Sequence, residues 1–307
     1  MERALVTGVT GFIGAHLART LIAEGATVHA VVRPDARLDR IPDLVDTVVF
    51  HVDDGTTERL ARAVRDAAPE ASFHLATNFV AEHRADQVGA LVADNVGFPA
   101  RLADALADAG ATSLVNVGTA WQHVDGAPYR PKNLYAATKQ AFEVVLQYYT
   151  DRDLLRVVTV NVYDSYGPLD HRGKLLSHLV RSLRTGEALD MGSGVQLIDL
   201  VHVDDIAAAL VGAADLLSDR STADRSTTGG VAQYAVSSGQ PRTLRELVAT
   251  LSSVAGTDVP VRWGARTDRA GDMTRPWTAG PPPPGWTPSV SLEAGLAALL
   301  AEDANDR

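Results

Sequence analysis

Tyr135 and Lys139 are the first two side chains in this sequence whose types and spacing suggest catalysis. They stand four residues apart in Tyr135-Ala136-Ala137-Thr138-Lys139, so in a helix they lie on one face. A phenol with a pKa of ~10 is a poor acid near neutrality, and we expect the ammonium of Lys139 to lower that pKa. Thr119 offers a hydroxyl for a carbonyl oxygen. Together the three side chains would bind a ketone and protonate its oxygen.

A glycine motif near the amino terminus indicates what would supply the hydride. The run Gly8-Val9-Thr10-Gly11-Phe12-Ile13-Gly14 follows a strand-like segment and precedes a helical pattern. Glycines there allow a tight turn and a close approach of the backbone to a pyrophosphate, and the helix N-terminus directs its free N–H groups at the anion. A glycine-rich turn without a ligand is the competing interpretation. The strand before it and the helix after it favour a dinucleotide site.

Arg33 bears on which dinucleotide is bound. It stands at the end of the second predicted strand, where an acidic side chain would hold the ribose 2′-OH of NAD. A guanidinium suits a 2′-phosphate instead, so the sequence favours NADP(H), although Asp35 leaves NAD open. Further cofactor contacts are expected at the ends of later strands: Asp53 near the adenine, and Leu75, Ala76 and Thr77 along the cofactor.

Short hydrophobic runs alternate with longer helical patterns through the first half of the chain. This alternation predicts an α/β fold with a Rossmann-type, doubly wound parallel sheet. Gly25 and Gly110 stand where helix C-terminal caps are expected. The predicted strands are Ala4–Thr7, Thr27–Val32, Thr47–Phe50, Ser72–Leu75, Leu114–Val117 and Arg156–Val160, and the predicted helices are Ile13–Glu24, Glu58–Ala68, Ala90–Ala109 and Leu134–Tyr149.

The second half is expected to form a smaller α/β substrate-binding region. We divide the chain into residues 1–165, the dinucleotide-binding domain, and 166–307, of which about 197–217 returns to the first domain. Asp204 and Asp205 are expected to cap the helix that follows them, and Ser218–Gly230 is interpreted as a surface loop. The other elements expected are a strand at Leu197–Val203, a helix at Leu244–Ala255, a strand near Val259–Trp263 and a terminal helix from Ser291.

Composition narrows the class of protein. The chain of 307 residues carries 28 basic and 38 acidic side chains, a net charge of −10, and 46% of it is hydrophobic. This content supports packed cores and argues against whole-chain disorder. The absence of cysteine excludes disulfides, thiolate nucleophiles and Cys-ligated metals, and the histidine spacings predict no metal site. No basic stripe, leader or spanning segment is recognisable, so we expect a cytoplasmic protein without nucleic-acid or membrane partners.

These motifs, in this order, resemble the extended short-chain dehydrogenase/reductase family, the group of nucleotide-sugar epimerases, dehydratases and reductases. The similarity covers nearly the whole chain. The narrower resemblance is to 4-ketoreductases of the CDP-abequose synthase kind. It implies a catalytic set of Thr119, Tyr135 and Lys139, a cofactor contact from Tyr163 and a homodimer. The run Thr7–Gly14 and the segments His74-Leu75-Ala76, Asp94-Asn95-Val96, Tyr166-Gly167-Pro168, Val201–Asp205 and Arg269–Asp272 carry the wider resemblance.

Departures from the family pattern narrow the reaction. Relatives that dehydrate nucleotide sugars have an Asp-Glu pair directly after the catalytic threonine, and here Ala120 and Trp121 stand there. Dehydration is therefore not expected, and reductases that also epimerise through a cysteine are excluded by composition. Two chemistries are left, ketone reduction and 4-epimerisation with retained NAD, and Arg33 favours reduction.

Substrate contacts are expected from Trp121, Asp164, Lys174 and Arg269. Trp121 could equally be core packing, and Lys174 a solvated charge. Ile198 replaces an arginine that the group often uses for the diphosphate, which keeps a non-sugar ketone, such as an aromatic polyketide, open. We expect an NADPH-dependent 4-ketoreductase acting on an NDP-4-keto-6-deoxyhexose, most simply TDP-linked. A 4-epimerase with tightly held NAD and a non-catalytic NADP sensor are the alternatives.

Overall fold

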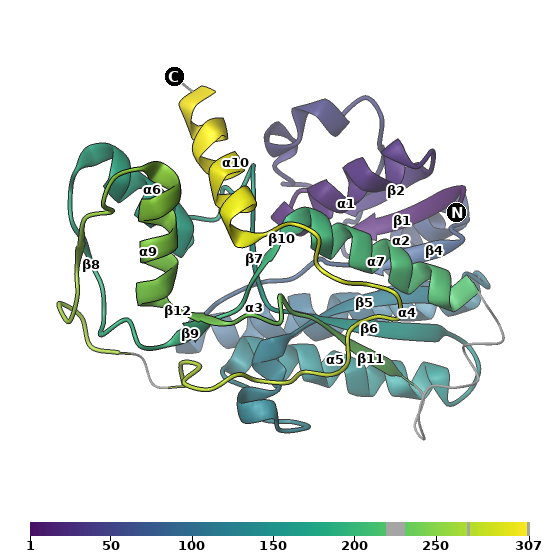
Figure 1. Cartoon of the computed structure of the whole chain (residues 1–307). Helices are drawn as coiled ribbons and strands as arrows, with labels where there is room; N and C mark the ends of the chain where they lie inside the picture. Colours follow the sequence, from purple (N-terminus) through teal and green to yellow (C-terminus); the bar gives the residue numbers. More distant parts are fainter. Residues whose placement is uncertain (219–230, 269–270, 306–307) are drawn as a thin grey trace.

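The main sheet organises the larger lobe of the molecule. The structure, a computed structural model, describes residues 1–218, 231–268 and 271–305. In this part of the chain the main sheet has seven parallel strands in the order β11-β6-β5-β4-β1-β2-β3 (Figure 1). The strands are β1 (Arg3–Thr7), β2 (Thr27–Val32), β3 (Val49–Val52), β4 (Ala71–His74), β5 (Ser113–Thr119), β6 (Arg156–Val162) and β11 (Ala232–Val236).

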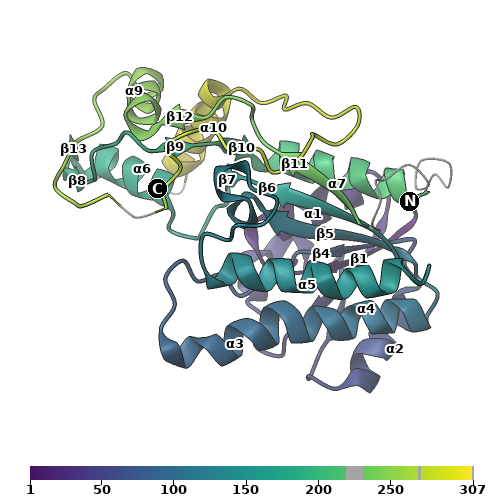
Figure 2. The same ribbon diagram turned by 90° about the horizontal axis from the view of Figure 1, so that it is seen from below.

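Helices cover both faces of this sheet, which confirms the Rossmann-type prediction (Figure 2). On one face lie α1 (Phe12–Ala23) and α7 (Val203–Ser218), and on the other α2 (Thr57–Ala67), α4 (Phe98–Asp108) and α5 (Leu134–Thr150). The inner strands β1, β4, β5 and β6 are almost wholly buried, as expected for strands covered on both faces. Strand β3, at one edge of the sheet, has no buried residue. Neighbouring strands β1 and β4 have connections that run in opposite directions, so ligands are expected at their carboxyl ends.

The predicted strands and helices of the first half agree with the structure within two residues at most ends, with two exceptions. Thr47 belongs to a turn, because its N–H and its hydroxyl both donate to Leu44 O, and β3 therefore starts at Val49. The helix predicted for Ala90–Ala109 is present but is not α-helical throughout. The chain forms α3 (Val88–Val92), a π-helical turn η4 (Ala93–Gly97) and then α4, whose second residue is Pro99.

A smaller lobe packs beside the carboxyl ends of the strands and contains α6 (Leu175–Thr185), α9 (Leu244–Ala255) and α10 (Leu292–Asn305) (Figures 1 and 2). In the described residues, three separate two-stranded sheets pair β7 (Asp164–Tyr166) with β10 (Leu200–His202), β9 (Leu197–Ile198) with β12 (Arg242–Thr243), and β8 (Leu189–Asp190) with β13 (Val261–Arg262). Short 3-10 turns occur at η1 (Leu38–Arg40), η2 (Pro42–Leu44), η3 (Ala85–Gln87), η5 (Ala120–Gln122) and η6 (Val124–Gly126).

Predictions for the second half need three corrections. The strand expected at Leu197–Val203 is two strands, because Asp199 accepts bonds from Ser237 Oγ and Ser238 N and the two halves pair with different partners. Helix α7 already begins at Val203, so the two aspartates lie in its first turn rather than before it. Strand β11 and helix α6 were missed. The loop predicted at Ser218–Gly230 lies almost wholly outside the described residues.

Asp205 ties the lobes together instead of capping its own helix. Its carboxylate accepts from Ser289 N at 2.9 Å, Ser289 Oγ at 2.6 Å and Val290 N at 3.1 Å. The chain segment before α10 is thereby held against α7. No helix in the described residues combines the length and the apolar character needed to cross a membrane.

Candidate active site

The glycine turn joins the end of β1 to α1 in a geometry that only glycine fits. Gly8 has a φ of +80°, and a Cβ there would lie 2.6 Å from Ala76 N at the end of β4. A Cβ on Gly14 would lie 2.2 Å from Gly8 O. Gly11 donates its N–H to Gly8 O at 2.9 Å and is the N-cap residue of α1. The turn is therefore closed tightly against both the helix and the neighbouring strand.

The N-terminus of α1 is open to an anion. Gly11 provides no side-chain cap, and the first turn carries no acidic residue, so the free N–H groups and the helix dipole are left for a ligand. Thr10 and Ile13 are half-buried, and Phe12 is buried with the Arg172 guanidinium 4.2 Å from its ring centroid. The close backbone approach and the N–H groups that lack a side-chain cap fit a dinucleotide pyrophosphate.

The residues expected at the adenosine end of the cofactor have partners of their own. Arg33 is largely exposed and lies 3.6 Å from the carboxylate of Asp35. Arg37 is bound bidentately by Asp39 at 2.8 and 2.7 Å. The buried carboxylate of Asp53 accepts from Arg101 at 3.4 Å and from Gly55 N at 3.2 Å. Arg33 is thus exposed enough to bind a 2′-phosphate. Asp35 beside it could compete for the guanidinium or accept a hydrogen bond from a 2′-hydroxyl.

The loop after β4 is fixed by one buried asparagine. Leu75 and Ala76 are half-buried there, and their N–H groups donate to Thr7 Oγ1. Asn95 accepts from Thr77 Oγ1 at 3.0 Å and from Asn78 N at 2.7 Å, and it donates to Asn78 O and to Thr138 Oγ1, each at 3.0 Å. Asn95 lies in the π-helical turn, which brings its side chain to this loop. Irregular turns of this kind are frequent at functional sites.

Thr119, Tyr135 and Lys139 lie where β5 ends and α5 begins. All three are buried, with exposed fractions of 9%, 8% and 3%. Asn133 starts α5 by accepting the N–H of Ala136 at 2.9 Å, which puts Tyr135 in the first turn. Thr119 Oγ1 accepts from Trp121 N at 3.3 Å, which leaves its hydroxyl hydrogen available to a ligand oxygen.

Burial dominates the protonation of this set. It raises the pKa of the Tyr135 phenol to about 12, against a smaller lowering by Thr77, and it lowers the pKa of Lys139 to about 8, opposed by the charge of Glu143. The expected lowering of the Tyr135 pKa by Lys139 is not found in this structure, where the net shift is upward because the phenol is desolvated. His74, whose pKa burial lowers well below its usual value, contacts Thr7 Oγ1 at 2.9 Å.

Aromatic and charged side chains surround Tyr135. The ring of Phe79 packs against Tyr135 and Trp121, with centroids 5.0 and 5.6 Å apart. Lys132 lies 4.7 Å from the Trp121 ring centroid and 3.0 Å from the carboxylate of Asp272. Trp121 is half-buried and contacts the same Phe79 ring that packs against Tyr135. Sequence reasoning did not single out Phe79 and Lys132; the position of Lys132 just before the Asn133 cap was the one available signal.

The structure describes two of the other three predicted substrate residues, Asp164 and Lys174. Burial raises the pKa of Asp164, opposed most by the charge of Lys174, and burial lowers the pKa of Lys174, opposed by the charge of Asp164. Arg172, two residues before Lys174, is held by hydrogen bonds to Asp170 and Ser165. Arg269 lies outside the described residues.

Tyr163 is turned into the protein. Its buried hydroxyl donates to Trp277 O at 2.8 Å and accepts from Ala279 N at 3.2 Å. Both bonds hold the segment around residues 277–279 against the main sheet. The hydrogen-bonding capacity that a cofactor contact would use is therefore engaged within the chain.

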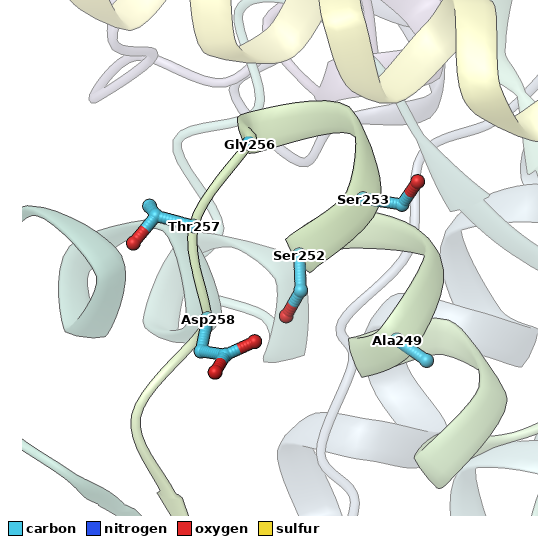
Figure 3. Close-up of a pocket in the computed structure, with 6 residues that line it drawn as sticks. All are labelled: Ala249, Ser252, Ser253, Gly256, Thr257 and Asp258. Atoms are coloured by element: carbon cyan, nitrogen blue, oxygen red, sulfur yellow. The ribbon is translucent and has the colours of Figure 1, made fainter.

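A separate hollow of about 420 Å³ lies at the carboxyl end of α9 in the smaller lobe (Figure 3). It contains none of the predicted site residues. Ser252 Oγ, on its wall, accepts from Val259 N at 3.0 Å and so closes the turn after the helix. The lining residues are Ala249, Ser252, Ser253, Gly256, Thr257 and Asp258.

Comparisons with known proteins agree with the resemblance drawn from the motifs. The profile of the NAD dependent epimerase/dehydratase family matches residues 4–222. UDP-glucose 4-epimerase of Mycolicibacterium smegmatis is 28% identical over 317 residues, 96% of each chain. CDP-abequose synthase of Yersinia pseudotuberculosis is 24% identical over 210 residues, 68% of this chain and 72% of the relative. A structure of MoeE5 in complex with UDP-glucose and NAD covers 99% of both chains with 26% identity and a TM-score of 0.80.

Proposed function

Because the chain belongs to the NAD dependent epimerase/dehydratase family, whose members are nicotinamide-dinucleotide-dependent enzymes, we propose that it reduces the 4-keto group of a nucleotide-linked 4-keto-6-deoxyhexose with NADPH. The observation that carries the proposal is the set of Thr119, Tyr135 and Lys139 at the junction of β5 and α5, followed by Ala120 and Trp121. That arrangement offers one proton donor and no second acid-base pair for eliminating water.

Each of the three side chains has a role that its surroundings support. The bound dinucleotide supplies the hydride. Thr119 donates its free hydroxyl hydrogen to the substrate carbonyl oxygen, and Tyr135 gives that oxygen its proton. Lys139 holds the nicotinamide ribose hydroxyls and stabilises the phenolate that forms when Tyr135 gives up its proton. Phe79 and Trp121 form an apolar wall on which a sugar ring packs.

The preference for NADPH rests on Arg33, exposed at the end of β2. Its guanidinium would bind the 2′-phosphate once it leaves Asp35. The ammonium groups of Lys132 and Lys174 would donate hydrogen bonds to oxygen atoms of the substrate. Homodimer formation through α5 is part of the proposal, and the exposed Val144 and Tyr148 on that helix support it.

A second candidate is 4-epimerisation of a nucleotide sugar with NAD that stays bound. The full-length similarity to a UDP-glucose 4-epimerase and the ion pair between Arg33 and Asp35 favour it. Both reactions use the same three catalytic side chains. They differ in whether the cofactor is consumed.

The deciding experiment measures the oxidation of NADPH and of NADH in the presence of each of a set of nucleotide 4-ketosugars. One aromatic polyketide ketone is included as the non-sugar substrate. We expect turnover with a ketosugar and NADPH. Replacement of Tyr135 by Phe should abolish turnover while leaving NADPH binding nearly intact. Co-purified NAD, released only on denaturation, together with interconversion of UDP-glucose and UDP-galactose, would establish the epimerase instead. Retained turnover in Y135F would refute the proposed mechanism.

A further inference from the structure

Glu143 is a buried carboxylate one helical turn after Lys139, and the proposed mechanism does not use it. Its exposed fraction is 4%. Three amide groups donate to it: Gln122 Nε2 at 2.7 Å, Gln233 Nε2 at 2.8 Å and Gln140 Nε2 at 3.3 Å. These partners come from η5, from β11 and from α5 itself. Burial raises the pKa of Glu143, and the three amide donors and the charge of Lys139 oppose that rise. Each of these amide partners is a donor, so the site matches an ionised carboxylate, which only accepts.

The same network reaches the backbone of the catalytic threonine. Gln122 Oε1 accepts the N–H of Thr119 at 3.0 Å, and this contact fixes which end of the Gln122 amide faces Glu143. Gln122 Nε2 also donates to Gln140 Oε1 at 3.0 Å. One carboxylate is therefore connected to the Thr119 backbone by a single fully buried side chain.

We propose that Glu143 is a positioning residue for the hydride-transfer site: it is the counter-charge that keeps Lys139 an ammonium, and through Gln122 it fixes the end of β5 that presents Thr119. The inference rests on the proposed function of Thr119, Tyr135 and Lys139. It adds a residue that touches neither substrate nor cofactor and acts through two that do.

The groups facing Lys139 support this assignment. Tyr135 and Glu143 lie on the same helix, and His74 comes from β4. Burial raises the pKa of Tyr135 to about 12 and holds the pKa of His74 well below its usual value, so both are neutral when Lys139 titrates. Glu143 is the group whose charge raises the pKa of Lys139 against the effect of burial. Glu143 is therefore the neighbour that can keep Lys139 charged.

The test is the pH profile of kcat/KM for Glu143→Gln. The substitution keeps the volume and removes the charge, and the new amide oxygen can accept from Gln122 Nε2. Gln233 can turn its amide so that its oxygen accepts from the new NH₂ group, while the 3.3 Å bond from Gln140 is lost. Without the counter-charge the pKa of Lys139 falls below about 8, so the alkaline limb should move to lower pH by about one unit. The expected loss is in kcat, with KM little changed. An unmoved alkaline limb would overturn the inference.

Two further variants separate charge from structure. Asp104→Asn also removes a carboxylate bonded to α5, where it accepts from Tyr149 at 3.1 Å, and it should leave the profile unchanged. Glu143→Asp keeps the charge but shortens the reach to Gln122, so kcat should fall while the limb stays in place. An alkaline limb that Glu143→Asp moves to lower pH than in the wild type would also contradict the inference, and because this comparison is made with the wild type it gives an answer even where Glu143→Gln does not fold.

The protonation of Lys139 can also be followed without turnover. The measurement is the affinity for NADPH between pH 6 and pH 10, determined from the fluorescence of the cofactor. If the wild-type protein reduces no ketone, the proposed function fails, and the binding profile still tests the counter-charge. A wild-type midpoint that Glu143→Gln shifts to lower pH would support the role of Glu143. Equal midpoints for the two proteins would refute it.

Discussion

Replacing Gly14 by Ala tests whether the turn after β1 is built for a pyrophosphate. The new Cβ would lie 2.2 Å from Gly8 O, whereas ordinary contacts begin near 3.4 Å. Helix α1 and the turn must therefore separate by roughly 1 Å. Because that carbonyl and the helix N-terminus belong to the same turn, the shift moves the N–H groups that would face the anion.

The substitution is expected to lower the affinity for NADPH more than the stability of the fold. Ala in place of Gly favours a helix by about 1 kcal/mol, whereas overpacking costs about 1–3 kcal/mol. The net loss of stability should lie between about 0 and 2 kcal/mol. Loss of one hydrogen bond to a charged group costs about 1.5–3 kcal/mol, so NADPH affinity should fall by about 10-fold to 100-fold.

The assay pairs fluorescence titration of NADPH with urea denaturation. Gly212→Ala in α7 is the matched control, because a Cβ there meets nothing within 4 Å and the backbone is not left-handed. That variant should gain about 0.5–1 kcal/mol and bind the cofactor normally. A folded Gly14→Ala protein that binds NADPH within threefold of the wild type would refute the reasoning.

Two other predictions concern stability. Asp205→Ala removes three hydrogen bonds from a buried carboxylate to Ser289 and Val290, so urea denaturation should show a loss of about 3 kcal/mol. Stability should also fall as the pH drops below about 6.5, because histidines with lowered pKa bind protons more readily when unfolded. Urea midpoints at pH 7.5 and 5.5 should differ less for His74→Gln than for the wild type; equal differences would contradict a role for His74. The histidines concerned are His29, His51, His74 and His202.

Local patterns were sufficient for the elements that carry the cofactor turn and the catalytic helix. The strands before Gly8 and Thr119 are continuous hydrophobic runs, and Asn133 is a recognisable cap for the helix of Tyr135. Each of these signals lies within a few residues of the element that it specifies. The sequence therefore placed the candidate chemistry at the ends of neighbouring parallel strands.

Features that depend on distant partners were not predictable in this way. Strand β11 is defined by its pairing with β6, and its polar start at Gln233 gives no strong strand signal. The π-helical turn arises where Asn95 bonds the loop after β4, and Pro99 follows two residues after that turn. The raised pKa of Tyr135 could not be anticipated, because it depends on how deeply the fold buries the phenol.

Strand β11 has a consequence for how the chain becomes active during synthesis. It pairs with β6 at one side of the main sheet, although it comes after the whole of α7 in the chain. Until β11 emerges from the ribosome, β6 is an unpaired edge that invites association with other strands. Glu143 also lacks its bond from Gln233 until then. A nascent chain that ends after α7 should therefore expose the edge of β6 and hold Glu143 by two amide donors instead of three.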